Sequence, residues 1–222
     1  MRLTLPASQL LRRLAMAFVG QLLFSFGNFL TVKANIGQAP WNAFQLGLGN
    51  ALSMTYGQAT ILVAFSVVAV DLLLREPIGL GTLMSALMVG GFYDFFDGLG
   101  IFPVIETFWL GLLVMLLGMA VMAWAQSIQM SACLGCGPRD AMMVGIGKRL
   151  RRTPIGLVSI LLTGTVCGLG ALMGGGVGFG TVLFLLCNGA VMQLVFNLIR
   201  FEPRDLIHLG LHEMVTFHPT AK

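Results

Sequence analysis

Apolar residues form six long runs along the chain, separated by short stretches rich in glycine, proline and charged residues. The runs are Leu14–Val32, Gly57–Leu74, Leu80–Phe96, Phe108–Ala125, Ile155–Met173 and Phe179–Leu198. Each has roughly the length that a helix needs to cross about 30 Å of hydrocarbon. The pattern therefore predicts an all-α membrane protein with about six transmembrane helices.

Two shorter segments, Pro40–Ser53 and Pro138–Arg151, begin with proline after a glycine-containing turn. Proline is favoured in the first turn of a helix, where its missing N–H costs nothing. Both helices are too short to span a bilayer, which leaves two interpretations. A re-entrant helix would point its N-terminal N–H groups into the protein, whereas an interfacial helix would place Lys148 and Arg149 among lipid headgroups.

The chain contains a duplication. Gly37–Ala43 (GQAPWNA) returns 98 residues later as Gly135–Ala141 (GCGPRDA), and the Gly-x-Gly-Thr segment Gly79–Thr82 returns as Gly178–Thr181. Such self-similarity indicates two equivalent structural units. Each unit holds three spans, so the second must enter the membrane from the side opposite to the first, which predicts inverted repeats. Duplication for the stability of a symmetric scaffold is the alternative.

This duplication divides the chain into five parts. We expect a cytoplasmic N-terminus (1–13), a first membrane repeat (14–98), an external linker (99–107), a second membrane repeat (108–199) and a cytoplasmic C-terminal tail (200–222).

Composition agrees with a bilayer location. Hydrophobic residues make up 57% of the chain and charged residues 10%, and the mean hydropathy is +0.89, which leaves too little polar surface for a soluble globule. With both termini in the cytoplasm, twelve Lys and Arg residues fall inside and only Lys33 falls outside, as the positive-inside rule requires. The net charge of +4 thus reflects membrane orientation and does not call for a nucleic-acid partner.

Taken together, the GxxPWxA segment at Gly37–Ala43, the two Gly-x-Gly-Thr turns and Gly137-Pro138-Arg139-Asp140 resemble the YczE/YyaS/YitT group of bacterial integral membrane proteins. The resemblance covers about residues 14–199. It implies a multi-spanning protein of the bacterial inner membrane, and it does not assign a transported substrate.

Candidate binding residues gather at the two proline segments. Arg139 and Asp140 form an ionisable pair at a membrane helix junction, which is costly unless the pair faces a partner or a cavity. The alternative is structural: Asp140 caps the short helix while Arg139 faces headgroups. The equivalent Trp41 and Asn42 carry no charge, so any proton or charged-substrate chemistry would belong to the second repeat.

Asn28 and Gln126 are equivalent positions in the first span of each repeat. We expect their amides to approach each other, either for helix packing or for substrate contact. The complete set of predicted substrate-binding residues is Asn28, Pro40, Trp41, Asn42, Gln126, Gly137, Pro138, Arg139 and Asp140.

Other chemistry finds little support. Cys133 and Cys136 have the spacing of half a metal site, without a second Cys or His pair at a matching distance. The spans hold no nucleophile–base set, so no enzyme activity, cofactor or metal is expected. Asp71 lies four residues before Arg75, which predicts an ion pair on one helix face, and Asp94 is a candidate proton acceptor near the external side.

Two function classes follow. The first is a small secondary transporter or permease for a small polar or anionic solute, with the lipid bilayer and a second copy of the chain as partners. The alternative is a non-transporting scaffold or regulatory subunit that holds another membrane protein.

Overall fold

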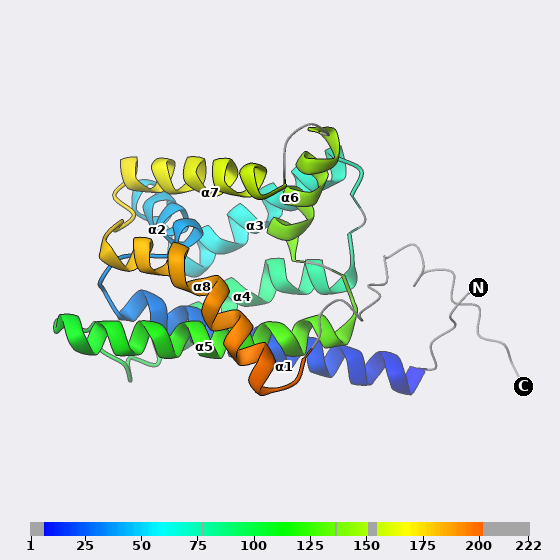
Figure 1. The fold of residues 1–222 in the computed structure, drawn as a ribbon, viewed down its shortest axis with the longest axis horizontal. Coiled ribbons are helices and arrows are strands. Elements are labelled where there is room, and N and C mark those ends of the chain that lie inside the picture. Colours follow the sequence, from blue (N-terminus) through cyan, green and yellow to red (C-terminus); the bar gives the residue numbers. More distant parts are fainter. Residues whose placement is uncertain (1–6, 77, 136, 151–154, 202–222) are drawn as a thin grey trace, which may run out of the picture.

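The computed structural model describes residues 7–76, 78–135, 137–150 and 155–201, and all regular structure in these ranges is helical (Figure 1). The helices are α1 (Ala7–Lys33), α2 (Pro40–Leu52), α3 (Tyr56–Leu73), α4 (Leu80–Gly98), α5 (Phe108–Ala132), α6 (Pro138–Arg149), α7 (Ile155–Leu172) and α8 (Phe179–Leu198). The predicted all-α class is confirmed. Both short helices begin at their prolines, as expected.

The long helices α1 and α5 lie antiparallel along one side of the bundle (Figure 1). Glycines allow their backbones to approach closely. A Cβ atom added at Gly27 of α1 would lie 2.8 Å from the carbonyl oxygen of Gly118, and one added at Gly118 of α5 would lie 2.8 Å from the carbonyl oxygen of Gly27. Small residues at such crossings give membrane helices their packing contact.

The remaining helices pack in a reciprocal pattern around this pair. Helix α4 packs against α1, and its counterpart α8 packs against α5. The short helix α2 packs against α7, while its counterpart α6 packs against α3. Each short helix therefore lies on a long helix of the other half of the chain, with α2 toward one end of the bundle and α6 toward the other (Figure 1).

Backbone hydrogen bonds also join the two halves of the chain in a reciprocal way. The N–H of Gly81 donates to the carbonyl oxygen of Leu134 at 2.9 Å, and the N–H of Gly180 donates to that of Ile36 at 2.7 Å. These are equivalent positions in the two copies.

Within each Gly-x-Gly-Thr turn, the threonine side chain accepts a hydrogen bond from the backbone of the first glycine. The hydroxyl oxygens of Thr82 and Thr181 accept hydrogen bonds from the N–H groups of Gly79 and Gly178. The segments therefore form tight turns with close helix packing.

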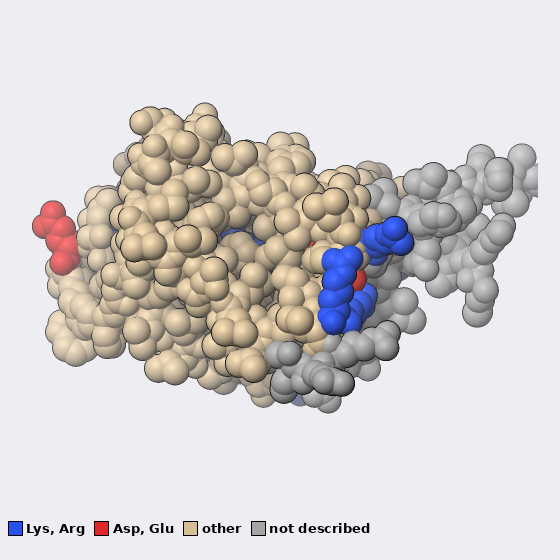
Figure 2. Space-filling model, turned by 90° about the horizontal axis from the view of Figure 1, so that it is seen from above, with Lys and Arg blue, Asp and Glu red and all other residues tan. Residues whose placement is uncertain are grey.

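In the described part of the chain, four helices are long and apolar enough to cross a membrane: Ser8–Lys33, Tyr56–Leu73, Phe108–Ala132 and Phe179–Leu198. Leu157–Leu172 adds a shorter apolar helix. On the face shown in Figure 2, Lys and Arg side chains gather at one end, an acidic side chain stands at the other, and the wide surface between them is nearly free of charge. This distribution fits an apolar belt with polar ends.

The predicted Asp71–Arg75 ion pair is wrong. The Asp71 side chain is fully buried, and neither carboxylate oxygen has a hydrogen-bond partner in the described part of the chain. Arg75 adopts a φ of 55° beyond the end of α3, so it leaves the helical spacing that would have aligned the two side chains. The neighbouring Glu76 instead pairs with Lys148 of α6 at 2.6 Å.

Candidate substrate-binding site

A network of buried polar side chains joins α1, α2 and α3. The Nδ2 of Asn42 donates to the Oδ1 of Asn28 at 2.6 Å, and the Nδ2 of Asn28 donates to the hydroxyl of Tyr56 at 3.1 Å. The Tyr56 hydroxyl in turn donates to the Oε1 of Gln45 at 3.0 Å. All four residues are buried. Hydrogen bonds offset the cost of burying such groups away from water.

A cavity of about 360 Å³ opens beside this network. Tyr56 lines it together with Tyr93, whose ring centroid lies 4.1 Å from that of Tyr56. An ion pair between Lys33 and Asp97, 2.7 Å apart, forms part of its wall. Gln38 also lines the cavity, and its buried Oε1 has no hydrogen-bond partner in the described residues. The cavity therefore offers a polar entrance that ends at the network.

Arg139 and Trp41 meet in the interior. The guanidinium of Arg139, in the first turn of α6, lies 4.8 Å from the centroid of the Trp41 ring in the first turn of α2. The two residues occupy equivalent positions of the duplication. A guanidinium over an indole face is attracted by the ring quadrupole, the more strongly where water is excluded.

The first turns of α2 and α6 are buried at Pro40 and Pro138, whereas their C-terminal ends at Asn50 and Arg149 are exposed. Gly137 is the N-cap residue of α6. A helix that runs from a buried N-terminus to an exposed C-terminus fits the re-entrant interpretation better than the interfacial one. Buried N-terminal N–H groups favour an anionic or polar ligand.

The structure thus brings four predicted residues into two pairs, Asn28 with Asn42 and Trp41 with Arg139. Gln126 is half-buried in α5, and the hydrogen bonds of the Asn28 amide go to Asn42 and Tyr56 instead. Asp140 belongs to the first turn of α6, but its side chain lies outside the described residues.

Sequence reasoning missed Gln45 and Tyr56. Gln45 stands three residues after Asn42, on the same face of α2. A buried polar pair at this spacing in an apolar helix was the available signal. Tyr56 gave no comparable signal, because its role depends on how α3 crosses α1.

The remaining candidate groups have structural roles. Asp94 accepts a hydrogen bond from the N–H of Gly57 at 2.8 Å and one from the Thr55 hydroxyl, and so holds the N-terminus of α3. Cys133 is a buried free thiol, and Cys136 lies outside the described residues. Among the residues described, no group of three or more His, Cys, Asp or Glu could hold a metal ion.

Comparison with known proteins places this fold in a family. Residues 11–197 match the family of unknown function DUF6198. An uncharacterized protein of Haemophilus influenzae is 30% identical over 181 residues, which cover 82% of each chain.

Two Bacillus subtilis proteins are also similar. The uncharacterized membrane protein YczE is 29% identical, covering 83% of this chain and 86% of its own. The uncharacterized protein YyaS is 26% identical, covering 80% and 89%. No solved structure matches. The chain therefore belongs to the DUF6198 family, with the YczE and YyaS proteins among its relatives.

Proposed function

We propose that this protein is a small secondary transporter of the bacterial inner membrane that moves a small polar or anionic solute. Its six spans form two inverted repeats. Helices α1, α3, α5 and α8 are the four long apolar spans, and α4 and α7 are the other two. The reciprocal packing of α2 on α7 and of α6 on α3 supports this arrangement, since a two-fold axis in the membrane plane would produce it. Inverted repeats of this kind bind substrate where the repeats meet.

One observation carries the proposal: equivalent residues of the two copies are in contact, and a buried polar network leads from the neighbouring Asn42 to a cavity. Trp41 and Arg139 touch across the repeat interface, and Asn42, beside Trp41, joins the network that ends at the cavity. A half-buried cation, amide groups and a tyrosine hydroxyl together suit a carboxylate or another compact polar solute.

The proposed transport cycle uses the same interface. The cavity lies at the Lys33 end of the bundle, which the positive-inside rule places outside the cell. The conformation described is then open to the outside. Rocking of one repeat against the other would close this cavity and expose the Asn28 network to the cytoplasm, and the solute would favour the state that binds it better.

Thermal unfolding of the purified protein tests the proposal with a panel of short carboxylates, amino acids, inorganic phosphate and polyols. We expect at least one class to raise the unfolding temperature of the wild type in a saturable manner. Arg139→Gln should abolish this effect. Arg149→Gln should keep it, because Arg149 is exposed and only caps the carbonyl oxygen of Leu73.

Uptake of the stabilising solute into proteoliposomes then tests transport directly. Stabilisation that persists in Arg139→Gln would contradict the site. The absence of any solute effect, together with a membrane protein that co-purifies at a fixed ratio, would favour the scaffold instead.

A further inference from the structure

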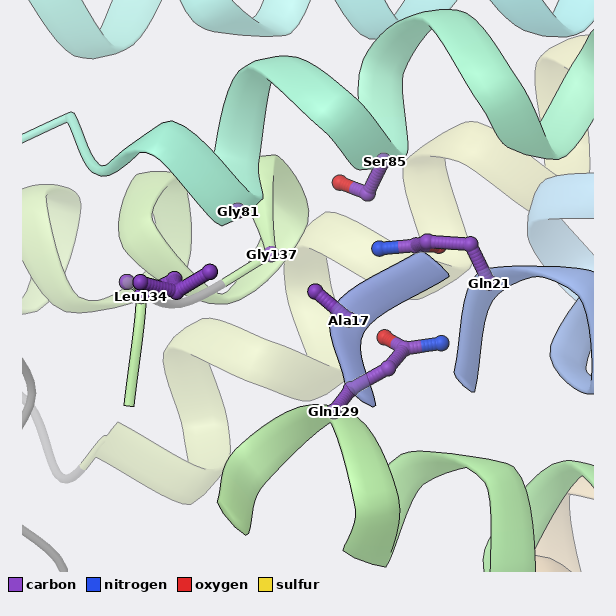
Figure 3. A pocket seen from close by; sticks show the side chains of 8 residues that line it. Ala17, Gln21, Gly81, Ser85, Gln129, Leu134 and Gly137 are labelled. Carbon is purple, nitrogen blue, oxygen red and sulfur yellow. The ribbon is translucent and has the colours of Figure 1, made fainter. Parts of the chain in front are cut away.

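A second, smaller pocket lies between α1, α4, α5 and the N-terminus of α6 (Figure 3). Its volume is about 30 Å³, which holds one or two particles of the size of water. Gln21, Ser85 and Gln129 supply its polar side chains, while Ala17 and the backbone of Gly137 leave the space open. Among the described residues, none that lines it is charged.

The two glutamine amides leave hydrogen-bonding groups unused. Gln21 is 3% exposed, and its Oε1 has no partner in the described residues. The Nε2 of Gln129 is likewise buried without a partner among them. In Figure 3, the amide nitrogen of Gln21 points into the space between Ser85 and Gly137. Buried amides without partners are rare in native structures and require an explanation. A bound anion accounts for the donor Nε2 groups, whereas the Oε1 of Gln21 is an acceptor and needs a separate donor.

Helix dipoles give the pocket a positive character. The N-termini of α4 and α6 converge there, with Gly79 and Gly137 as their N-cap residues. A Cβ atom added at Gly79 would lie 2.6 Å from the Cα of Gly135. Each N-terminus carries about half a positive charge, and the C-terminus of α5, which ends nearby at Ala132, offsets one of them. Counting these backbone dipoles alone, about half a positive charge remains at the pocket, which favours an anion.

The symmetry-equivalent place between α5, α8 and α1 shows that this pocket is not a necessary product of the fold. There the equivalent positions hold larger or apolar side chains: Met115 for Ala17, Met119 for Gln21, Phe184 for Ser85 and Thr31 for Gln129. Met115 and Met119 are fully buried and pack with Phe184 in one apolar cluster. The same backbone arrangement is therefore filled with apolar side chains in one copy and left open and polar in the other.

We propose that this pocket binds a single small monovalent anion of the size of chloride or bromide. The anion accepts hydrogen bonds from the amide of Gln21 and from N–H groups at the start of α6. A tetrahedral oxyanion such as sulfate or phosphate is too large for about 30 Å³. Binding of this ion goes beyond the proposed function, since it requires no transport.

Thermal unfolding of the purified full-length protein tests the site in sodium chloride, bromide, gluconate and sulfate at matched ionic strength. We expect chloride and bromide to raise the unfolding temperature of the wild type in a saturable manner, and gluconate and sulfate to have no such effect. Gln21→Met copies the equivalent Met119 of the second repeat and should lower the apparent halide affinity tenfold or more, roughly the effect of losing a charge-assisted hydrogen bond.

The control is Gln193→Met on α8, where the glutamine is exposed and donates only to Asn197; this variant should keep the wild-type halide response. If Gln21→Met cannot be purified, Ala17→Met fills the pocket from the preceding turn and must give the same loss. A wild type that responds equally to all four salts would overturn the proposal and indicate water in the pocket. A halide response unchanged in Gln21→Met or Ala17→Met would do so as well.

The same assay separates this site from the proposed transport site. Arg139→Gln should leave the halide response intact, because Arg139 does not line the pocket. The absence of a halide response would therefore overturn the halide site without bearing on the proposed solute site. The absence of a solute response would likewise not bear on the halide site.

Discussion

Gly118 sits at a close approach of α1 and α5, where the two halves of the chain meet. A methyl group at this position would lie 2.8 Å from the carbonyl oxygen of Gly27 and 2.8 Å from the Cγ2 of Thr31. These distances are about 0.6 Å shorter than the 3.4 Å at which ordinary contact begins. One of the neighbours is backbone, which cannot rotate away, so the two helices must separate.

We therefore expect Gly118→Ala to destabilise the protein by about 1–3 kcal/mol, the usual range for overpacking in a well-packed interior. Gly91→Ala is the matched control. Gly91 lies within α4, and nothing stands within 4 Å of a Cβ atom built there. Alanine is favoured over glycine in a helix by up to about 1 kcal/mol, so this variant should be neutral or more stable.

Unfolding in mixed micelles, followed by circular dichroism as the fraction of denaturing detergent rises, measures both variants. A Gly118→Ala protein as stable as the wild type would refute the close α1–α5 contact. Equal losses in Gly118→Ala and Gly91→Ala would show that glycine itself is required, and not the approach of the two helices.

Three further predictions concern the network, the repeat interface and a helix cap. Tyr56→Phe removes hydrogen bonds to Asn28 and Gln45 and should cost roughly 1–3 kcal/mol, whereas Tyr93→Phe keeps its ring against that of Tyr56 and should change the unfolding free energy little. A double-mutant cycle of Trp41→Leu and Arg139→Gln should give a coupling free energy of about 1–2 kcal/mol, and additive losses would contradict the contact. Thr181→Val loses the hydrogen bond from Gly178 and should cost about 1 kcal/mol, while Thr165→Val on the exposed face of α7 should stay within about 0.5 kcal/mol.

The helices could be predicted from the sequence because their signals are local. Proline at the first turn sets the start of α2 and α6, and apolar runs set the long helices to within a few residues. The ends were less certain: α5 continues to Ala132, seven residues beyond the expected end. Its last two turns carry serine and glutamine, so hydrophobicity alone ended the prediction too early.

The site could be predicted only in part, because the duplication identified positions but not their partners. It pointed to Asn28, Asn42 and Arg139, which the structure brings to one region. It did not show that Asn28 would hydrogen-bond to Asn42 and Tyr56 and not to Gln126, since these partners depend on how three helices cross. The Asp71–Arg75 pairing failed for a related reason: helical spacing applies only while both residues remain in the helix, and Arg75 does not.

The central claim, two inverted repeats across a membrane, is tested most directly by the sidedness of equivalent positions. Leu52 and Leu150 stand 98 residues apart at the ends of the two short helices, and they are 50% and 49% exposed. Each is changed to cysteine in a chain whose four native cysteines are replaced by serine or alanine. A membrane-impermeant thiol reagent is then applied to intact cells and to inverted vesicles. With inverted repeats, Leu52→Cys reacts from outside and Leu150→Cys from the cytoplasmic side, whereas labelling of both from one side would contradict the inverted arrangement.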